Sequence, residues 1–368
     1  FYCDLLGFQV SDTINFNRDE HTAVEKVGSG LGLFTRHGTD HHSFVLFPKR
    51  VVDARPGREH IPKDVTINQI TWQVGTLREV VNGNQWLGQI GMKINRQGRD
   101  TPGSNWHTYP IAPGHHINEL YYGIEQVGWD GLSKPMAMHT IHYDKPPSLP
   151  HRAEYVEVDD ATKNRGIDIR TGYRHEEKDA PKYDVGGVLL PRPFKITKIG
   201  PVRLFADDID QALDFYRDVL GLTVTEEVKY KGHRCVFLRS NTEHHSLALY
   251  PRALRKELGL SEHTTLMAFG VQVNDYQQLK DAVKYLKENG VTIKYLPPEL
   301  FPGIDYSAIA IDPEGHAVQL YCYMEQIGWD GKPRHAAQRR KIDNDHWPES
   351  LEPMSDSYDG EVFLGPLG

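Results

Sequence analysis

Two pairs of adjacent histidines are the first residues in this sequence whose type and setting could do chemistry. His41-His42 and His244-His245 each precede a serine and a short apolar run that ends in proline. An imidazole changes its charge near neutral pH and therefore suits proton transfer. Consecutive side chains of a strand point to opposite faces, so only one member of each pair can face a cavity. Because the pair occurs twice, packing or hydrogen bonding explains it as well as catalysis does.

A second group of polar residues surrounds Tyr109. Glu119 follows this tyrosine by ten residues, and His107, His115 and His116 lie close to both in the sequence. Imidazoles and carboxylates are common metal ligands, so His115 is a candidate substitute ligand or pocket donor. Taken alone, however, Glu119 is equally well explained as a surface carboxylate on an edge strand. Trp72 and Trp106 would suit the wall of a pocket for a flat aromatic molecule, although aromatic strand residues more often belong to a core.

The elements that must position these residues occur twice in the chain. Three segments recur in the same order, which indicates an internal duplication. They are Phe1–Val10 with Phe215–Val224, Asp40–Pro48 with Glu243–Pro251, and Glu119–Gly131 with Gln319–Gly331.

The second copy begins earlier in its own pattern than the first. The run Ile199–Ala206 predicts a strand, and the helix after it begins near Asp207 and ends at Gly221. Phe1 corresponds to Phe215, so the first copy lacks that strand and half of the helix. We expect an N-terminally incomplete sequence rather than a domain with an open sheet edge.

The pattern within each copy is a strand, a helix and three strands, repeated once. In the second copy, Leu266–Val273 predicts a strand, and 276–289 predicts a helix that ends before Gly290. We therefore predict an α+β fold with two homologous domains, each built of two βαβββ modules. The predicted boundaries are 1–131 for the first domain, 132–195 for a connecting segment, 196–331 for the second domain and 332–368 for a tail.

Composition limits the classes of function. The chain has 368 residues, 39% of them hydrophobic, and a formal net charge of −8. The negative charge argues against nucleic acid as the main partner. No apolar run is long enough for a membrane-spanning helix. The three cysteines are too few and too scattered for a disulfide framework, and they fit a reducing cytoplasm.

The sequence resembles the vicinal oxygen chelate superfamily, which includes glyoxalases, bleomycin resistance proteins and dioxygenases. The resemblance lies in the repeated modules, their helix ends, the His-His-Ser strands and the final Glu/Gln-Leu-Tyr strands. Within the superfamily, the two-domain type I extradiol catechol dioxygenases are the most similar group. In those enzymes two His and one Glu hold Fe(II) and leave positions for a catecholate and O₂. The superfamily also contains isomerases, epimerases and metal-free binding proteins, so the resemblance is more specific for fold than for reaction.

The resemblance assigns roles to particular residues of the first domain. Glu119 falls at the position of the carboxylate ligand, and Tyr109 matches the tyrosine that bonds a substrate oxygen. Asp100 replaces the second active-site histidine of the family, and His42 falls at the acid/base position. The second ligand position falls on Gln69, whose amide oxygen is a weaker donor than imidazole. Gln69 is equally well explained as an ordinary strand residue of a domain that has lost its metal, and the third ligand position lies before Phe1.

The second domain is degenerate by the same comparison. Its three ligand positions carry Pro201, Ala268 (or Phe269 after a shift of one residue) and Gln319, and Ile309 replaces the tyrosine. Proline, alanine and phenylalanine side chains cannot bind a metal, so no metal site of this type is expected there.

The resemblance implies an Fe(II)-dependent extradiol dioxygenase, with Mn(II) as the alternative metal, that acts on a small catecholic aromatic and O₂. It also implies a homo-oligomer. Two alternatives remain open: a glyoxalase-like metal-dependent isomerase, lyase or hydrolase, for which the pairing of Gln69 with Glu119 argues, and a metal-free small-molecule-binding protein of the same fold.

Overall fold

The chain forms two compact units. The computed structural model describes residues 1–16, 30–54, 58–99, 103, 105–128, 130–139, 149 and 152–351. The C-terminal unit comprises Phe1–Gly7, Lys63–Ile67 and Lys178–Pro366, and the N-terminal unit comprises Phe8–Pro62, Asn68–Glu177 and Leu367–Gly368. Among the described residues, none of the helices has both the length and the apolar character that a membrane span requires.

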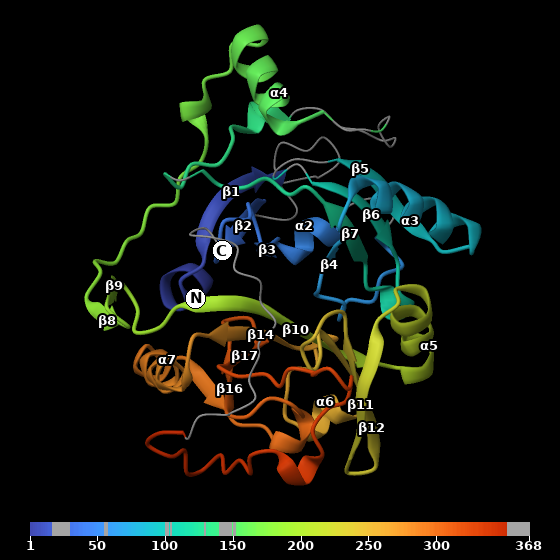
Figure 1. Cartoon of the computed structure of the whole chain (residues 1–368), viewed down its shortest axis with the longest axis vertical. Coiled ribbons are helices and arrows are strands. Elements are labelled where there is room, and N and C mark those ends of the chain that lie inside the picture. Colours follow the sequence, from blue (N-terminus) through green and yellow to red (C-terminus); the bar gives the residue numbers. More distant parts are fainter. Residues whose placement is uncertain are drawn as a thin grey trace. The chain divides into compact units, whose positions relative to one another are not determined.

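An eight-stranded sheet forms the centre of the C-terminal unit, in the order β11-β12-β13-β10-β14-β17-β16-β15 (Figure 1). Strand β10 is parallel to β13 and antiparallel to β14, which in turn is parallel to β17. The pairing of β10 with β14 thus joins two modules into one sheet. The strands are β10 (Ile196–Ala206), β11 (Thr223–Tyr230), β12 (His233–Arg239), β13 (Leu247–Pro251), β14 (Leu266–Val273), β15 (Thr292–Lys294), β16 (Ser307–Ile311) and β17 (Ala317–Tyr321), and a separate hairpin pairs β8 (Tyr183–Val185) with β9 (Val188–Leu190).

Two helices of this unit, α5 and α7, begin at aspartates. The Asp208 carboxylate accepts hydrogen bonds from two backbone N–H groups at the start of α5 (Ile209–Leu213), and a helical turn at Asp214–Val219 continues this helix. Asp275 caps α7 (Tyr276–Glu288) in the same way. Helix α7 contacts β14, β15, β16 and β17, and α6 (Leu254–Glu257) is a short turn after β13. The buried face of α7 carries Leu279, Ala282, Val283 and Leu286.

The N-terminal unit contains two smaller sheets. One has the order β1-β2-β3, and the other has the order β4-β7-β6-β5. Helix α3 (Leu77–Gln89) contacts the second sheet and begins with a capping box, in which Thr76 and Glu79 bond each other's backbone N–H groups. The strands are β1 (Gln9–Asn15), β2 (Leu31–Arg36), β3 (Phe44–Leu46), β4 (Ile70–Gln73), β5 (Ile94–Arg99), β6 (Trp106–Pro110) and β7 (Asn118–Tyr122), and the other helices are α2 (Lys49–Asp53) and α4 (Glu154–Asp159).

The predicted α+β fold with repeated βαβββ modules is confirmed. The order of elements from β10 to β13, from β14 to β17 and from β4 to β7 is strand, helix and three strands each time. Before β1 the sequence supplies only the helical turn Tyr2–Leu6, which belongs to the C-terminal unit. Segment 132–195, for which the sequence shows little periodicity, contains α4, and Arg99 forms two hydrogen bonds of 2.7 and 2.9 Å with Glu157 of this helix.

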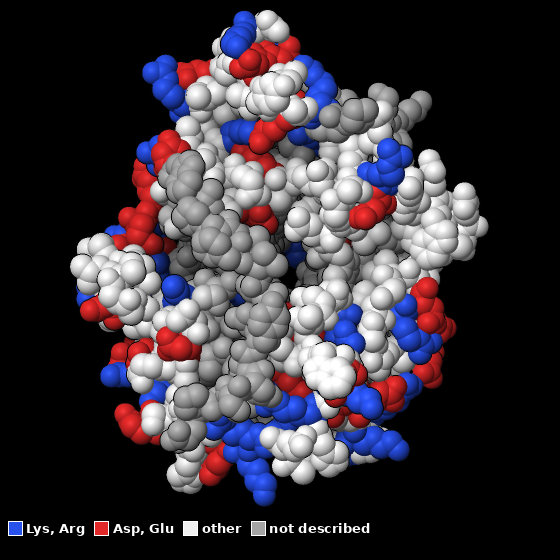
Figure 2. All heavy atoms as spheres, in the orientation of Figure 1, with Lys and Arg blue, Asp and Glu red and all other residues white. Residues whose placement is uncertain are grey.

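Charged side chains of both signs are interspersed over the visible face of the molecule (Figure 2). No single basic surface dominates the part of that face that the structure describes. This distribution agrees with the negative net charge.

Candidate functional site

The sheet β4-β7-β6-β5 brings the predicted site residues onto one of its faces. Thr71 of β4 lies opposite Glu119 of the parallel strand β7, and His107 of β6 lies opposite Tyr121 of the same strand. Because side chains alternate along a strand, Gln69 and Tyr109 share the face of Glu119.

The two tryptophans belong to the opposite face. Trp106 is in the core cluster with Leu77 and Val80 of α3, and Trp72 donates a hydrogen bond of 2.9 Å to the Asn118 side chain. The interpretation of these tryptophans as a wall of the Glu119 pocket is therefore wrong, and the alternative of ordinary packing holds for Trp106.

Glu119 is buried and held by neutral donors. Only 1% of the residue is exposed. Its Oε1 accepts a hydrogen bond of 2.5 Å from the Asn105 amide. Its Oε2 accepts one of 2.6 Å from Gln69 Nε2 and one of 3.1 Å from Thr71 Oγ1. Burial raises the pKa of Glu119, and its hydrogen bonds with Asn105, Thr71 and Tyr109 oppose that rise only in part.

Aromatic and basic groups complete the surroundings of this carboxylate. His107 Nδ1 lies 3.8 Å from Glu119 Oε1, and the His107 and Tyr109 rings are 4.4 Å apart. Arg96 donates a hydrogen bond of 3.4 Å to the Tyr109 hydroxyl and lies over the ring, 4.7 Å from its centre. A substrate next to Glu119 would thus meet a carboxylate, a phenol and an imidazole.

The histidine pair lies in the same unit, just before β3. His41 is fully buried and its backbone N–H donates to the Glu125 carbonyl, whereas His42 is half-buried. The two Nδ1 atoms are 3.0 Å apart, and His41 Nε2 lies 3.8 Å from the Asp12 carboxylate. Burial, together with the neighbouring His41, lowers the pKa of His42 to about 3. That His42 is the member of the pair that faces the substrate stays a prediction.

The second copy repeats this arrangement closely. The Nδ1 atoms of His244 and His245 are also 3.0 Å apart, and the His244 backbone N–H donates to the Glu325 carbonyl. In each copy a glycine of positive φ, Gly103 or Gly303, packs against the pair so closely that a Cβ would meet an imidazole at 2.8 or 2.5 Å. This repetition supports a structural role for both pairs, whatever chemistry His42 adds.

Asp100 falls outside the described residues, so its predicted role stays a prediction.

His115 is not placed as the sequence suggests. On a continuous strand, His115 would share the face of Glu119, because the two residues are four positions apart. Instead, His115 lies in a helical turn with a φ of 65°, before the bridge at Ile117, and its ring is 5.8 Å from that of His60. It therefore does not share the strand face of Glu119.

Comparison with known proteins relates one part of the chain to a family. Residues 198–320 match the model of the Glyoxalase/Bleomycin resistance protein/Dioxygenase superfamily. This stretch is a domain of the vicinal oxygen chelate superfamily. No curated protein matches the sequence.

Solved structures are similar in fold over a larger part of the chain. A catechol 2,3-dioxygenase matches with a TM-score of 0.51 and 16% identity, over 99% of this chain and 92% of that chain. The 2,3-dioxygenase LapB from Pseudomonas sp. KL28 matches with a TM-score of 0.53 and 14% identity, over 91% and 90% of the two chains. The halotolerant catechol dioxygenase BphC matches with a TM-score of 0.51 and 14% identity, over 90% and 84%. At these identities the similarity shows the two-domain fold alone.

The strand register shows which positions of the two copies correspond. Gly270 of β14 lies opposite Gln319 of β17, as Thr71 lies opposite Glu119. Two residues before Gly270 is Ala268, and two residues before Thr71 is Gln69. Gln69 of the first copy therefore corresponds to Ala268 of the second copy, and the shift of one residue to Phe269 is not needed.

The described residues do not by themselves complete a metal site. Glu119 could supply one carboxylate oxygen, and Gln69 could supply a neutral one if its amide were turned. No group of three or more His, Cys, Asp and Glu able to hold a metal occurs within the described residues. A divalent cation at Glu119 would thus find fewer than the three protein ligands of a facial site among the residues seen here.

Sequence reasoning missed three neighbours of Glu119. Thr71 could have been found, because it lies two residues after Gln69 and strand periodicity puts both on one face. Arg96 contacts Tyr109 across the β5–β6 hairpin. The strand register is irregular between Ile94 and Gln97, so simple alternation does not predict this contact. Asn105 precedes β6 and carries no local signal of its role.

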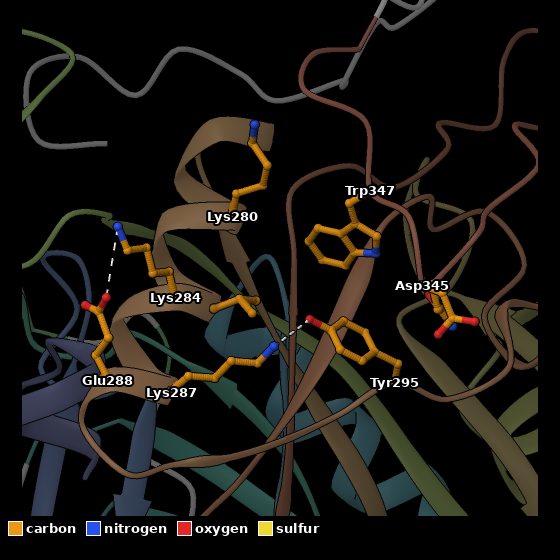
Figure 3. Close-up of a pocket in the computed structure, with 9 residues that line it drawn as sticks. Lys280, Lys284, Lys287, Glu288, Tyr295, Asp345 and Trp347 are labelled. Carbon is orange, nitrogen blue, oxygen red and sulfur yellow. Dashed lines mark hydrogen bonds and ion pairs between the residues drawn. The ribbon is translucent and has the colours of Figure 1, made fainter.

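A separate pocket of about 410 Å³ lies in the C-terminal unit between α7 and the segment that follows β17. Lys280, Lys284 and Lys287 of α7 line one side, and Tyr295 and Trp347 line the other (Figure 3). Lys287 donates a hydrogen bond of 3.2 Å to the Tyr295 hydroxyl. None of the candidate site residues lines this pocket.

Proposed function

We propose that the N-terminal unit carries the active site of an extradiol-type ring-cleaving dioxygenase, which acts on a small catecholic aromatic with O₂ and a divalent metal, Fe(II) or alternatively Mn(II). The observation that carries the proposal is the convergence of Glu119, Gln69 and Tyr109 on one sheet face, in a chain whose fold resembles that of catechol dioxygenases. All three residues were expected there from the family pattern.

Glu119 and Gln69 are the residues that would bind the metal. Glu119 is held from both sides by Asn105, Gln69 and Thr71, which fixes the direction of its oxygens before any ligand arrives. Burial raises its pKa, so a cation that binds the ionised carboxylate must displace a proton over a wider pH range than usual.

Tyr109 is proposed to hydrogen-bond a substrate oxygen. Its hydroxyl accepts a hydrogen bond from Arg96 and is hydrogen-bonded to Glu119, so a substrate oxygen would take the place of that carboxylate as the acceptor of its proton. The guanidinium over the ring also favours negative charge on that oxygen. Tyr109 would therefore bind a catecholate more strongly than a neutral catechol.

His42 is proposed as the acid/base group. Because its pKa is lowered to about 3, the imidazole is uncharged near neutral pH and able to accept a proton. The same low pKa makes it a weak base, so its contribution depends on a substrate that binds as a partly ionised catechol.

One observation favours a second candidate, a metal-free binding protein of the same fold. The Glu119 oxygens already accept three hydrogen bonds from neutral side chains, which stabilise the carboxylate without a cation. A small molecule with a hydroxyl pair could bind in this polar site without being transformed. The glyoxalase-like alternative needs a metal and no O₂.

The test is metal analysis and oxygen uptake on anaerobically purified full chain. Glu119→Gln is compared with the native protein and with Glu176→Gln, a control that changes an exposed carboxylate of the same unit. We expect about one iron or manganese per chain and O₂ uptake with a catechol in the native and control proteins, with both lost in Glu119→Gln. Metal-dependent turnover without O₂ uptake would replace the proposal with the isomerase alternative. Binding of catechols by metal-free protein without turnover would replace it with the binding protein.

A further inference from the structure

Arg203 of β10 is buried in the C-terminal unit, and no carboxylate among the described residues pairs with it. None of the residue is exposed. Its Nη2 lies 3.2 Å from His245 Nε2, and the guanidinium lies 5.1 Å from the centre of the Phe301 ring. Within the part of the chain that the structure describes, Nε and Nη1 have no hydrogen-bond acceptor.

The positive charge of this guanidinium needs a compensating negative charge. Arginine does not lose its proton in proteins, so burial cannot neutralise it. Burial lowers the pKa of Arg203, and electrostatic interactions with Tyr250 and Tyr321 and a hydrogen bond with Tyr250 oppose this without supplying a carboxylate. A buried cation without a partner is strongly unfavourable, and native structures normally supply one.

The position of Arg203 is that of the lost metal site. Across the sheet it pairs with Ala268 of β14 and with Ala248 of β13, two small residues that leave room for its side chain. Ala268 stands where the first copy has Gln69, and Gln319 stands where it has Glu119. Gln319 Oε1 is also buried and lacks a donor among the described residues. The domain has thus replaced its ligand side chains and gained a fixed cation beside them.

The histidine pair does not supply the missing charge. The Arg203 N–H that points at His245 requires the lone pair of Nε2, so the proton of His245 lies on Nδ1 and can be donated to His244 Nδ1 at 3.0 Å. His244 Nε2 then donates to Glu226 at 3.0 Å, and Arg339 pairs with that carboxylate at 2.8 Å. Glu226 is therefore reached only through two neutral imidazoles and already has a cation of its own.

We propose that this domain binds a small monovalent anion, a halide ion or a carboxylate group, at the Nε and Nη1 atoms of Arg203. The guanidinium provides three unused N–H groups, and such a cation favours a compact anion that accepts two or more of them. The site does not depend on the proposed dioxygenase activity, because it lies in the domain that lacks the ligand residues.

The test is thermal unfolding of the full chain, titrated at constant ionic strength with sodium chloride, bromide, formate or acetate and balanced with a bulky buffer anion. The native protein is compared with Arg203→Met and with Arg217→Met, a control that removes an exposed arginine of the same domain. We expect a saturable rise in the unfolding midpoint of the native and control proteins and none in Arg203→Met. A response to chloride and bromide alone identifies a halide site, and a response to formate or acetate identifies a carboxylate site.

A second measurement keeps the proposal testable if Arg203→Met does not fold. Crystals of the native protein soaked in bromide should show an anomalous peak within hydrogen-bond distance of the guanidinium, and Arg203→Lys should bind the anion more weakly. The proposal is overturned if the native midpoint shows no saturable response, if Arg203→Met responds as the native protein does, or if Arg203 is bonded to water alone.

Discussion

The side-chain amide of Gln69 lies 2.6 Å from the Glu119 carboxylate, although the two residues are fifty positions apart. They meet because β4 and β7 are parallel neighbours in the sheet. The amide donates to a carboxylate whose pKa burial raises, so the pair holds a titratable group inside the N-terminal unit. Both the proposed chemistry and the stability of this unit depend on that contact.

The stability of the protein is predicted to depend on pH through Glu119. Its pKa is raised by burial, so above the ordinary glutamate value of about 4.3 the native state keeps a proton that the unfolded state has lost. The native state therefore loses stability as the pH rises through this range. Glu119→Gln cannot ionise, so its stability relative to the native protein should increase with pH. Urea unfolding of both metal-free proteins between pH 4 and 8 measures this difference.

A bound metal should reverse that trend. The cation binds only the ionised carboxylate, so the stabilisation that Fe(II) or Mn(II) gives to the native protein should grow with pH. Glu176→Gln is the control and should follow the native protein throughout. A difference between Glu119→Gln and the native protein that does not change with pH would mean that Glu119 ionises as it does in water.

The repeat and the order of the modules could be predicted from the sequence, because strand and helix periodicity are local properties. The positions of Gln69, Tyr109 and Glu119 in the site were implied by the family resemblance rather than by periodicity. Asn105 and Arg96 could not be predicted in the same way. Asn105 lies in a loop, and Arg96 lies beside a register irregularity, so only the folded backbone determines what they contact.

The helix within the connecting segment could not be predicted from the sequence, for a related reason. Helix α4 spans only Glu154–Asp159, none of its residues is buried, and Arg99 of β5 bonds Glu157 on it. A helix held by an ion pair rather than by an apolar face leaves no hydrophobic period in the sequence. Arg203 was overlooked because a charged residue in a strand is usually expected at the surface.

His42 is predicted to destabilise the protein in mild acid. Its pKa of about 3 lies below the unfolded value of about 6.5, so between these values the unfolded state binds more protons than the native state. Native stability should therefore fall as the pH drops from 6.5. At pH 5 the loss relative to His42→Asn should be about 2 kcal/mol, at 1.36 kcal/mol per pKa unit.

The measurement is denaturant unfolding at pH 5 and pH 7.5. His346→Asn is the matched control, because 84% of the His346 side chain is exposed. The difference in stability between His346→Asn and the native protein should be the same at both pH values. Equal pH dependence in His42→Asn and the native protein would mean that His42 is solvated and titrates normally, which would make it a stronger base than proposed.

Gly270→Ala is predicted to disrupt the sheet of the C-terminal unit. A Cβ at this position would lie 2.2 Å from the Gly200 carbonyl oxygen, and the contact is with backbone that cannot rotate away. We expect a loss of about 3 kcal/mol or more in the free energy of unfolding. Gly328→Ala is the control, since nothing lies within 4 Å of its added Cβ and its φ is not positive. Thermal unfolding that left the two variants equal would show that β10 and β14 can separate locally at little cost.

Asp64 is predicted to stabilise the C-terminal unit through two arginines. Its Oδ2 accepts hydrogen bonds of 2.7 Å from Arg252 and 3.0 Å from Arg255, and only 19% of the Asp64 side chain is exposed. Asp64→Asn removes the carboxylate that the two guanidinium groups share, although Arg252 keeps its pair with Asp207. We expect a loss of about 1–3 kcal/mol in the free energy of unfolding. Asp218→Asn is the control, because its pair with Arg217 is exposed and solvent screens it, so no measurable loss is expected. Urea unfolding at low and at high salt separates the two cases: the effect of Asp64→Asn should persist in high salt, whereas an effect that disappeared would place Asp64 among the surface pairs.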